Sequence, residues 1–286
     1  MTTTPATPHP STAHPALDGP DASVRAVLAT GPRPPRPGPG SVSLAFGHRA
    51  LLKIKHVPEQ LIDVIFIPVL FTLMFTYLFG GALAGSIGDY LQFLLPGTLV
   101  MTIVLVSTYT AATLNSDLAS GAFDRFRSLP IWRPAPLVGM LIGDAGRYLV
   151  ASSIVLALGL AMGFRPEGGV VGVLLAVALL LVFSAGLAWV WMTLALVART
   201  PATVSTASLL VVFPLTFASN VFVDPATMPG WLQKFVDVNP VSHLVTAVRG
   251  LMAGETPGAI GWVLAASAGL VVVFAPLALR LYGRKG

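Results

Sequence analysis

Cysteine is absent from the 286 residues, and charged residues are scarce. The lack of thiols excludes disulfides, cysteine nucleophiles and thiolate metal sites. Only 10% of the residues are Asp, Glu, Lys or Arg, whereas a soluble domain carries about 25%. Because 55% of the residues are hydrophobic and the mean hydropathy is +0.80, the apolar residues must also face lipid. The composition predicts an integral membrane protein.

Nucleotide-binding and catalytic motifs are also missing. The chain has no G-x-x-x-x-G-K-[ST] loop, and none of its four lysines follows a glycine. No Ser-His-Asp arrangement is visible, and the five histidines show no spacing typical of metal ligands (His9, His14, His48, His56 and His243). We therefore expect no catalytic residue, no metal site and no ATPase in this chain.

Long uncharged runs predict an all-α membrane protein with six transmembrane helices. The helices are expected at about 61–81, 90–114, 137–164, 170–197, 201–223 and 257–280. A helix needs about 20 apolar residues to cross the hydrocarbon core, so each run is long enough. The Pro-, Thr- and Ala-rich residues 1–43 cannot bury enough apolar surface to fold, and they are expected to form a disordered cytoplasmic tail. Residues 44–286 then form the transmembrane domain.

The distribution of Lys and Arg predicts the orientation. With the amino terminus inside, the predicted cytoplasmic segments hold thirteen Lys and Arg residues and the outer segments hold three (Arg165, Lys234 and Arg249). Positive residues accumulate in short cytoplasmic loops, so both termini are expected in the cytoplasm. The same distribution accounts for the net charge of +5 without a nucleic-acid partner.

Residues 44–57 form a basic segment before the first predicted span. Leu44, Leu51 and Ile54 recur at helical spacing, with the cations Arg49, Lys53 and Lys55 between them. The pattern favours an amphipathic helix on an anionic membrane surface. The alternative is a charged flank of the first transmembrane helix.

The cytoplasmic segment 115–136 carries an apolar stripe. Phe123, Phe126 and Leu129 lie three residues apart, so a short helix would place them on one face. The charged residues between them are Asp124, Arg125 and Arg127. Exposed aromatic residues on a charged element suggest a surface for a protein partner. The alternative is a helix that rests on lipid headgroups.

The outer segment 224–255 is too long and too apolar for a simple loop. One short helix can begin at Pro229 and carry Trp231 and Phe235, and a second can begin at Asn239-Pro240, an N-cap followed by proline. Neither helix is long enough to cross the membrane. We expect a re-entrant pair, which is acceptable where the backbone is buried in protein. Two surface helices on the outer leaflet are the alternative.

Asp144 and Arg147 are the charged residues within the predicted third helix. Three residues apart, they can pair on one helix face, and a structural ion pair is favoured over a functional site. A proton-coupled secondary transporter usually needs carboxylates near the middle of the membrane, and this sequence offers only Asp144, which lies near the cytoplasmic end of its helix. Secondary transport is therefore the second hypothesis, and a membrane scaffold or channel subunit is the third.

The chain resembles the ABC-2 type permeases, specifically the daunorubicin-resistance-like group of bacterial exporters. The resemblance covers about residues 44–284 and is carried by the order of the six spans and by four sequence stretches. These stretches are Arg125-Phe126-Arg127-Ser128-Leu129-Pro130-Ile131, Met228-Pro229-Gly230-Trp231-Leu232, Asn239-Pro240-Val241 and Ala247-Val248-Arg249-Gly250-Leu251.

The resemblance implies a working unit of two permeases, expected to be a homodimer, and two separate ATPase subunits that bind ATP and Mg²⁺. Residues 121–130 would include the coupling helix, with Phe123, Asp124, Arg125, Phe126, Arg127 and Leu129 against the ATPase. Residues 228–252 would close the outer end of the pathway, with Trp231, Phe235, Asn239, Pro240 and Arg249 at the gate. The second and fifth helices are expected to wall the pathway. The substrate would be a hydrophobic drug, antibiotic or lipid, and the location the bacterial inner membrane.

Overall fold

The computed structural model describes residues 38–56, 58–120, 132 and 134–284. For Pro39, and for residues 50–56 and 58–65, the description is limited to the helical backbone. The predicted coupling residues 123–129 and most of the predicted tail therefore lie outside the described part of the chain, as do the side chains of Lys53 and Lys55.

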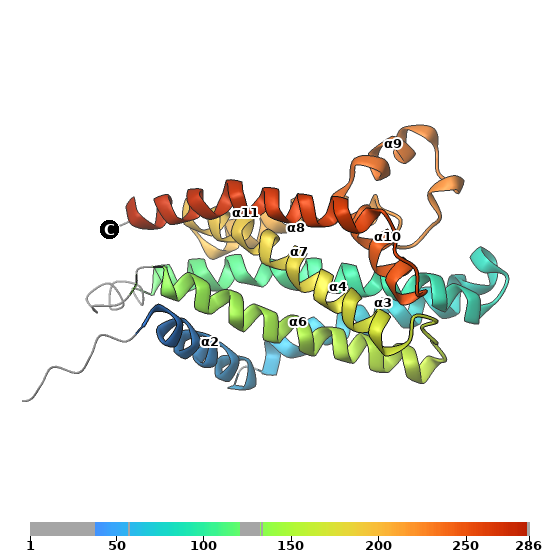
Figure 1. The fold of residues 1–286 in the computed structure, drawn as a ribbon, viewed down its shortest axis with the longest axis horizontal. Helices are drawn as coiled ribbons and strands as arrows, with labels where there is room; N and C mark the ends of the chain where they lie inside the picture. Colours follow the sequence, from blue (N-terminus) through green and yellow to red (C-terminus); the bar gives the residue numbers. More distant parts are fainter. Residues whose placement is uncertain (1–37, 57, 121–131, 133, 285–286) are drawn as a thin grey trace, which may run out of the picture. The chain divides into compact units, whose positions relative to one another are not determined.

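Every regular element among the described residues is helical. In chain order they are α2 (Pro39–His56), α3 (Pro58–Ala84), α4 (Ile87–Ala119), α6 (Ala135–Met162), α7 (Gly169–Val197), α8 (Pro201–Phe217), the short 3₁₀ helix η1 (Pro225–Thr227), α9 (Gly230–Val238), α10 (Pro240–Met252) and α11 (Ala259–Arg284). The all-α prediction is confirmed for the part of the chain that the structure describes (Figure 1).

Five helices are long and apolar enough to cross a membrane. They are α3 from Phe66 onwards, α4, α6, α7 and α11. The remaining predicted span, the fifth at 201–223, corresponds to α8, which has 17 residues and ends at Phe217, six residues before the predicted boundary. The helix stops because the chain turns at Ala218, where Asn239 of a later segment takes up the carbonyls of Leu215 and Ala218.

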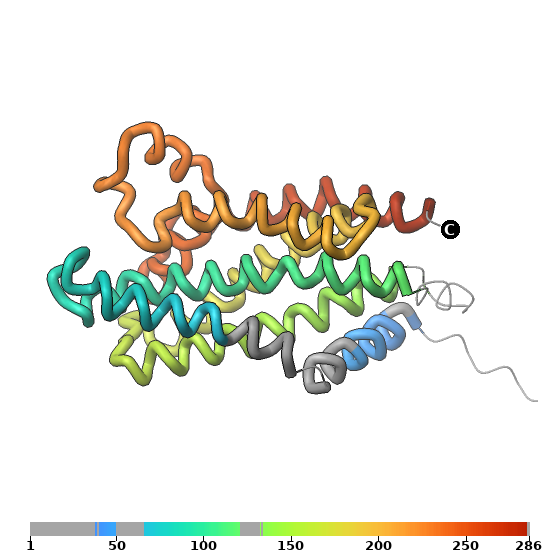
Figure 2. Tube along the Cα trace, turned by 180° about the vertical axis from the view of Figure 1, so that it is seen from behind, coloured from blue at the N-terminus to red at the C-terminus, as the bar shows by residue number. Residues whose placement is uncertain are grey.

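Helix α4 forms the centre of the bundle within residues 38–284. In its candidate span 78% of the residues are buried in the protein, against at most 39% in the other four. Helices α3, α6, α7 and α8 all pack against α4, and α11 packs along α7. The last turn of α4 and the end of α11 lie at one end of the bundle, and α9 and the turn between α3 and α4 lie at the other (Figures 1 and 2).

Two close backbone approaches depend on glycine. A Cβ on Gly97 of α4 would lie 2.8 Å from the carbonyl oxygen of Val221, so this glycine lets the segment after α8 pack directly on α4. A Cβ on Gly139 of α6 would lie 2.3 Å from the Cβ of Phe46, so this glycine seats α2 on α6.

The seating of α2 explains a difference from the predicted boundary. Helix α2 begins at Pro39, five residues before the predicted start at 44 and inside the predicted tail. Val42 and Ser43 are buried, and Gly47 lies against Ile142 of α6. Packing on α6 therefore extends the helix beyond the amphipathic pattern, and α2 is partly a helix of the protein interior. Arg49 is exposed on it.

Candidate functional site

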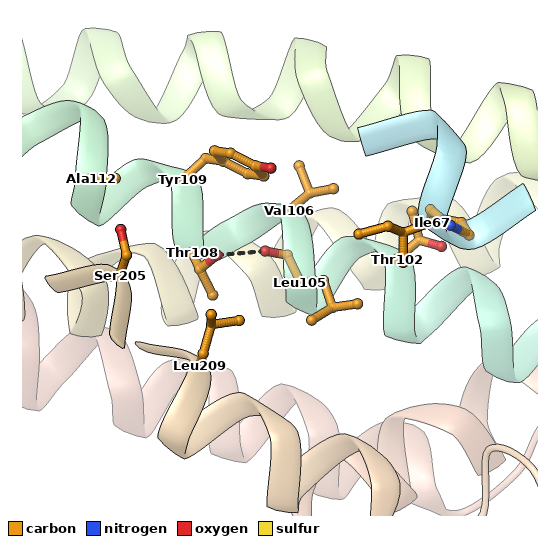
Figure 3. A pocket seen from close by; sticks show the side chains of 10 residues that line it. Ile67, Thr102, Leu105, Val106, Thr108, Tyr109, Ala112, Ser205 and Leu209 are labelled. Atoms are coloured by element: carbon orange, nitrogen blue, oxygen red, sulfur yellow. Dashed lines mark hydrogen bonds between the residues drawn. The ribbon is translucent and has the colours of Figure 1, made fainter. Parts of the chain in front are cut away.

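A cavity lies between α3, α4 and α8 (Figure 3). Its volume is about 240 Å³. Helix α4 supplies most of its wall, and Ile67 and Pro68 of α3 and Ser205 and Leu209 of α8 complete it. The residues of α4 in the wall are Thr102, Leu105, Val106, Thr108, Tyr109 and Ala112. The cavity is therefore lined by the two predicted pathway helices, the second (α4) and the fifth (α8), and by the first (α3).

The lining of this cavity is apolar with a few neutral hydroxyl groups. Thr108 donates to the carbonyl of Leu105 at 2.7 Å, and Thr102 donates to the carbonyl of Thr98 at 2.6 Å. Ser205 donates in the same way to Pro201 at 3.1 Å. Because these three hydroxyl groups donate within their own helices, their oxygens remain as acceptors, and the lining residues carry no charge. Such a surface suits an uncharged, largely apolar ligand.

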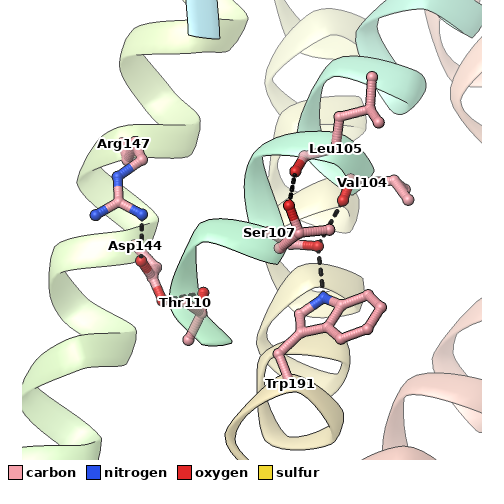
Figure 4. Close-up of polar contacts among 8 residues, drawn as sticks. Val104, Leu105, Ser107, Thr110, Asp144, Arg147 and Trp191 are labelled. Carbon is pink, nitrogen blue, oxygen red and sulfur yellow. Dashed lines mark hydrogen bonds and ion pairs between the residues drawn. The ribbon is translucent and has the colours of Figure 1, made fainter. Parts of the chain in front are cut away.

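Asp144 and Arg147 form the predicted ion pair, with Arg147 Nη1 3.0 Å from Asp144 Oδ1. The structure adds a partner that the sequence analysis missed, because Thr110 of α4 donates to Asp144 Oδ2 at 2.7 Å. Asp144 is only 3% exposed, and Figure 4 shows its carboxyl group between the two partners. Both carboxylate oxygens are thus engaged, which fits the favoured structural interpretation of the pair.

Two further polar contacts fasten α4 to α7. Trp191 Nε1 donates to Ser107 Oγ at 2.8 Å (Figure 4). Asn115 donates to the carbonyls of Ala195 and Ala198 at 2.9 and 3.2 Å, so it caps the end of α7. Interhelical hydrogen bonds of this kind join neighbouring membrane helices. Nothing in the hydropathy pattern distinguishes these positions from their neighbours.

Asn239 holds the outer segment together. Its side-chain oxygen accepts from the backbone N–H of Val241 at 2.9 Å, which confirms the predicted N-cap before Pro240. Its amide nitrogen donates to Leu215 at 2.7 Å and to Ala218 at 2.9 Å. One side chain therefore starts α10 and also satisfies carbonyls that the end of α8 leaves free.

Arg249 connects three segments near the same end of the bundle. Its guanidinium donates to the carbonyls of Phe93 and Asn220 at 3.1 Å, and it lies 3.9 Å over the centre of the Phe93 ring. Burial lowers the pKa of Arg249 to about 10, with Asp224 opposing that shift, so the group stays protonated at neutral pH. Together with Gln92 and Arg165 it lines a second cavity of about 400 Å³.

The five predicted gate residues do not form one cluster. Asn239, Pro240 and Arg249 belong to the junction of α8, α10 and α4. Trp231 and Phe235 lie on α9 with 73% and 38% of their surfaces exposed. Among the helices described, α9 packs only against α10 and η1, whereas α10 packs against α4, α7, α8, α9 and α11. The two short helices therefore differ in burial, and α10 is the one enclosed by the bundle.

No group of three or more His, Cys, Asp or Glu residues that could hold a metal occurs among the described residues.

The chain was compared with protein families and with curated proteins. The family model described as "ABC-2 type transporter" matches residues 43–253.

Two relatives are permeases by name. The chain is 51% identical over 264 residues to the daunorubicin resistance ABC transporter permease protein DrrB1 of Streptomyces coeruleorubidus, and the match covers 92% of this chain and 93% of the relative. It is 28% identical over 221 residues to the probable doxorubicin resistance ABC transporter permease protein DrrC of Mycobacterium tuberculosis, covering 76% and 80%. The chain therefore belongs to the ABC-2 type transporter family, as a permease.

Proposed function

We propose that this permease moves a hydrophobic drug, antibiotic or lipid-like compound out of the cell, driven by ATP hydrolysed on a separate subunit. The observation that carries the substrate class is the uncharged cavity of about 240 Å³ between α3, α4 and α8. The names of the relatives support a drug, since they refer to resistance to daunorubicin and doxorubicin. ATP and Mg²⁺ would bind on the partner, and no cofactor would bind on this chain.

The proposed arrangement in the bacterial inner membrane has six crossings. Helix α8 would supply the remaining crossing, because its 17 residues span about 26 Å, close to the thickness of the hydrocarbon core. The excess of Lys and Arg in the predicted cytoplasmic segments supports a cytoplasmic position for both termini. Burial of Leu244, Val245 and Val248 supports a re-entrant position for α10 at the outer end, with α9 at the outer surface.

The proposed complex contains an ABC ATPase that docks on the segment between α4 and α6. The last turn of α4 and the first turn of α6 lie at the same end of the bundle as the end of α11 (Figure 1). Phe123, Phe126 and Leu129 would supply the apolar contact, and Asp124, Arg125 and Arg127 would set its register by charge. A second copy of the permease would complete the pathway.

The first experiment is co-purification with candidate ABC ATPases in nanodiscs, followed by ATP hydrolysis with and without daunorubicin. A stable complex with drug-stimulated hydrolysis is the expected result. Transport that proceeds without any ATPase and follows a proton gradient would instead establish the secondary transporter.

Leu209→Trp tests the cavity directly. The indole would occupy the space that Leu209 borders, so half-maximal stimulation should require about tenfold more drug. Leu210→Trp is the matched control, because Leu210 is the next residue on α8, is 75% exposed and does not line the cavity. Equal drug responses in the two variants would remove the cavity from the proposed pathway.

A further inference from the structure

Thr110 and Asp144 join the two helices that flank residues 120–134. Thr110 lies nine residues before the last residue of α4, and Asp144 lies nine residues after the first residue of α6. At about 1.5 Å per residue, both are about 13 Å along their helices from the connecting segment. The 2.7 Å hydrogen bond between them therefore joins the two arms of a helical hairpin at matched depth.

Burial and charge strengthen the hydrogen bond between Thr110 and Asp144. Asp144 is buried, and its two oxygens have different partners, Thr110 on α4 and Arg147 on its own helix. A buried carboxylate is costly unless it is paired, and a hydrogen bond to a charged acceptor is about twice as strong as one between neutral groups. The ion pair with Arg147 favours the charged form of the carboxyl group and leaves its other oxygen for Thr110 on α4. We name Thr110, Asp144 and Arg147 the α4–α6 bridge.

The same part of α4 contributes Thr110 to the bridge and neighbouring residues to the cavity wall. Tyr109, next to Thr110, lines the cavity towards α3 and α8, and so do Leu105 and Ala112. Thr110 faces Asp144 on α6 (Figure 4). A displacement of the last turn of α4 and the first turn of α6 would therefore reach the cavity wall through both helices, provided that the two helices stay together.

We propose that the α4–α6 bridge makes α4 and α6 move as one hairpin, so that motion at the last turn of α4 and the first turn of α6 shifts the cavity wall. Asp144 is then a positioning residue that acts through Thr110. The inference rests on the proposed function, because it presupposes an ATPase that moves these two turns.

Thr110→Val tests the bridge with little change in volume. The variant loses the donor to Asp144 and leaves the ion pair with Arg147 in place. In a reconstituted complex it should hydrolyse ATP while the number of drug molecules moved per ATP falls about fivefold or more, the range of a typical coupling free energy. Thr110→Ser keeps the hydroxyl and should restore the ratio.

Ser107→Ala is the matched control. It removes a buried hydrogen bond of similar length from the same helix, but the partner is Trp191 on α7, which does not flank the segment. The control should lower the melting temperature as Thr110→Val does and leave the transport ratio unchanged. If both variants lower stability and neither changes the ratio, or if both change it equally, the bridge has only a structural role.

A distance measurement tests the inference without transport. The chain has no cysteine, so spin labels can be placed at Ser116→Cys on α4 and Leu149→Cys on α6, both exposed. With Thr110 present the distance distribution should be narrow and unchanged by ATP in the complex, and with Thr110→Val it should broaden. Equally narrow distributions would overturn the inference.

The labelled permease also distinguishes a failure of the proposed function from a failure of the α4–α6 bridge. If no ATPase forms a complex, the proposed function fails, but the bridge still predicts a narrow distribution for the permease alone and a broad one for Thr110→Val. Identical distributions in the permease alone would reject the bridge itself.

Discussion

Single polar side chains connect helix ends in this protein. Asn239 contacts the start of α10 and the end of α8, and Arg249 contacts carbonyls from two other segments. Buried carbonyl and N–H groups without partners are costly, so each of these side chains makes an irregular backbone possible inside the bundle.

Asn239→Ala should destabilise the protein more than loss of a simple helix cap would. The cap contributes about 1 kcal/mol, and the carbonyls of Leu215 and Ala218 would each add about 1–3 kcal/mol if left unpaired. Thermal unfolding of the purified permease measures the effect. Asn239→Ser keeps a cap acceptor and loses the amide donor, so its melting temperature should lie between those of the unsubstituted protein and Asn239→Ala. Equal melting temperatures for Asn239→Ala and Asn239→Ser would contradict the double role.

At the scale of elements, the contact between α2 and α6 shows how packing changes the meaning of a sequence pattern. The basic spacing of residues 44–57 predicts a helix on the membrane surface, and the helix forms, but Val42, Ser43 and Gly47 bury one side of it. The amphipathic pattern alone contained no sign of the partner helix, because Gly139 has no side chain to mark the contact.

Gly139→Val should separate α2 from α6. The new side chain would begin 2.3 Å from the Cβ of Phe46, which is too close for any real pair, so the helices must part. We expect a marked loss of folded protein after detergent extraction, measured by size-exclusion chromatography before and after heating. Gly261→Val on α11 is the control, since nothing lies within 4 Å of its added Cβ. A Gly139→Val protein as heat-resistant as the control would show that α2 is not held at this contact.

At the scale of the whole molecule, the two ends of the bundle differ in charge and in structure. The proposed orientation places Glu255, before α11, outside the cell and Arg199, between α7 and α8, inside. Both residues are exposed. Because the chain lacks cysteine, single substitutions give an unambiguous test.

A membrane-impermeant maleimide should label Glu255→Cys in intact cells and Arg199→Cys only after lysis. The expectation follows from the excess of Lys and Arg on the cytoplasmic side. The unsubstituted chain, which has no thiol, measures the background. Labelling of Arg199→Cys in intact cells would reverse the proposed topology.

Much of the fold could be predicted from local pattern, and the errors have local causes. The long uncharged runs locate α3, α4, α6, α7 and α11, because a lipid-exposed helix must be apolar along its length. The boundary of α8 differs from the prediction because an uncharged run does not show where a helix turns. Asn239-Pro240 was recognisable as a helix start, since capping depends on adjacent residues.

The candidate site could be predicted only in part. The pairing of Asp144 with Arg147 follows from their spacing within one helix, but Thr110 lies 34 residues away in sequence. Likewise, the hydroxyls of the cavity resemble any others in a membrane helix until α3 and α8 are seen to enclose them.

The amino-acid sequence by itself determined that this protein is helical, membrane-embedded and without its own nucleotide loop, because composition, hydropathy and motifs act within a single stretch of chain. Only the tertiary structure decided that α4 is the central helix, that α2 is seated on α6, and that Thr110, Asn115 and Arg249 join distant segments. Those facts depend on which helix faces meet. In a chain whose helices are apolar on nearly every side, hydropathy does not distinguish a face towards lipid from a face towards another helix.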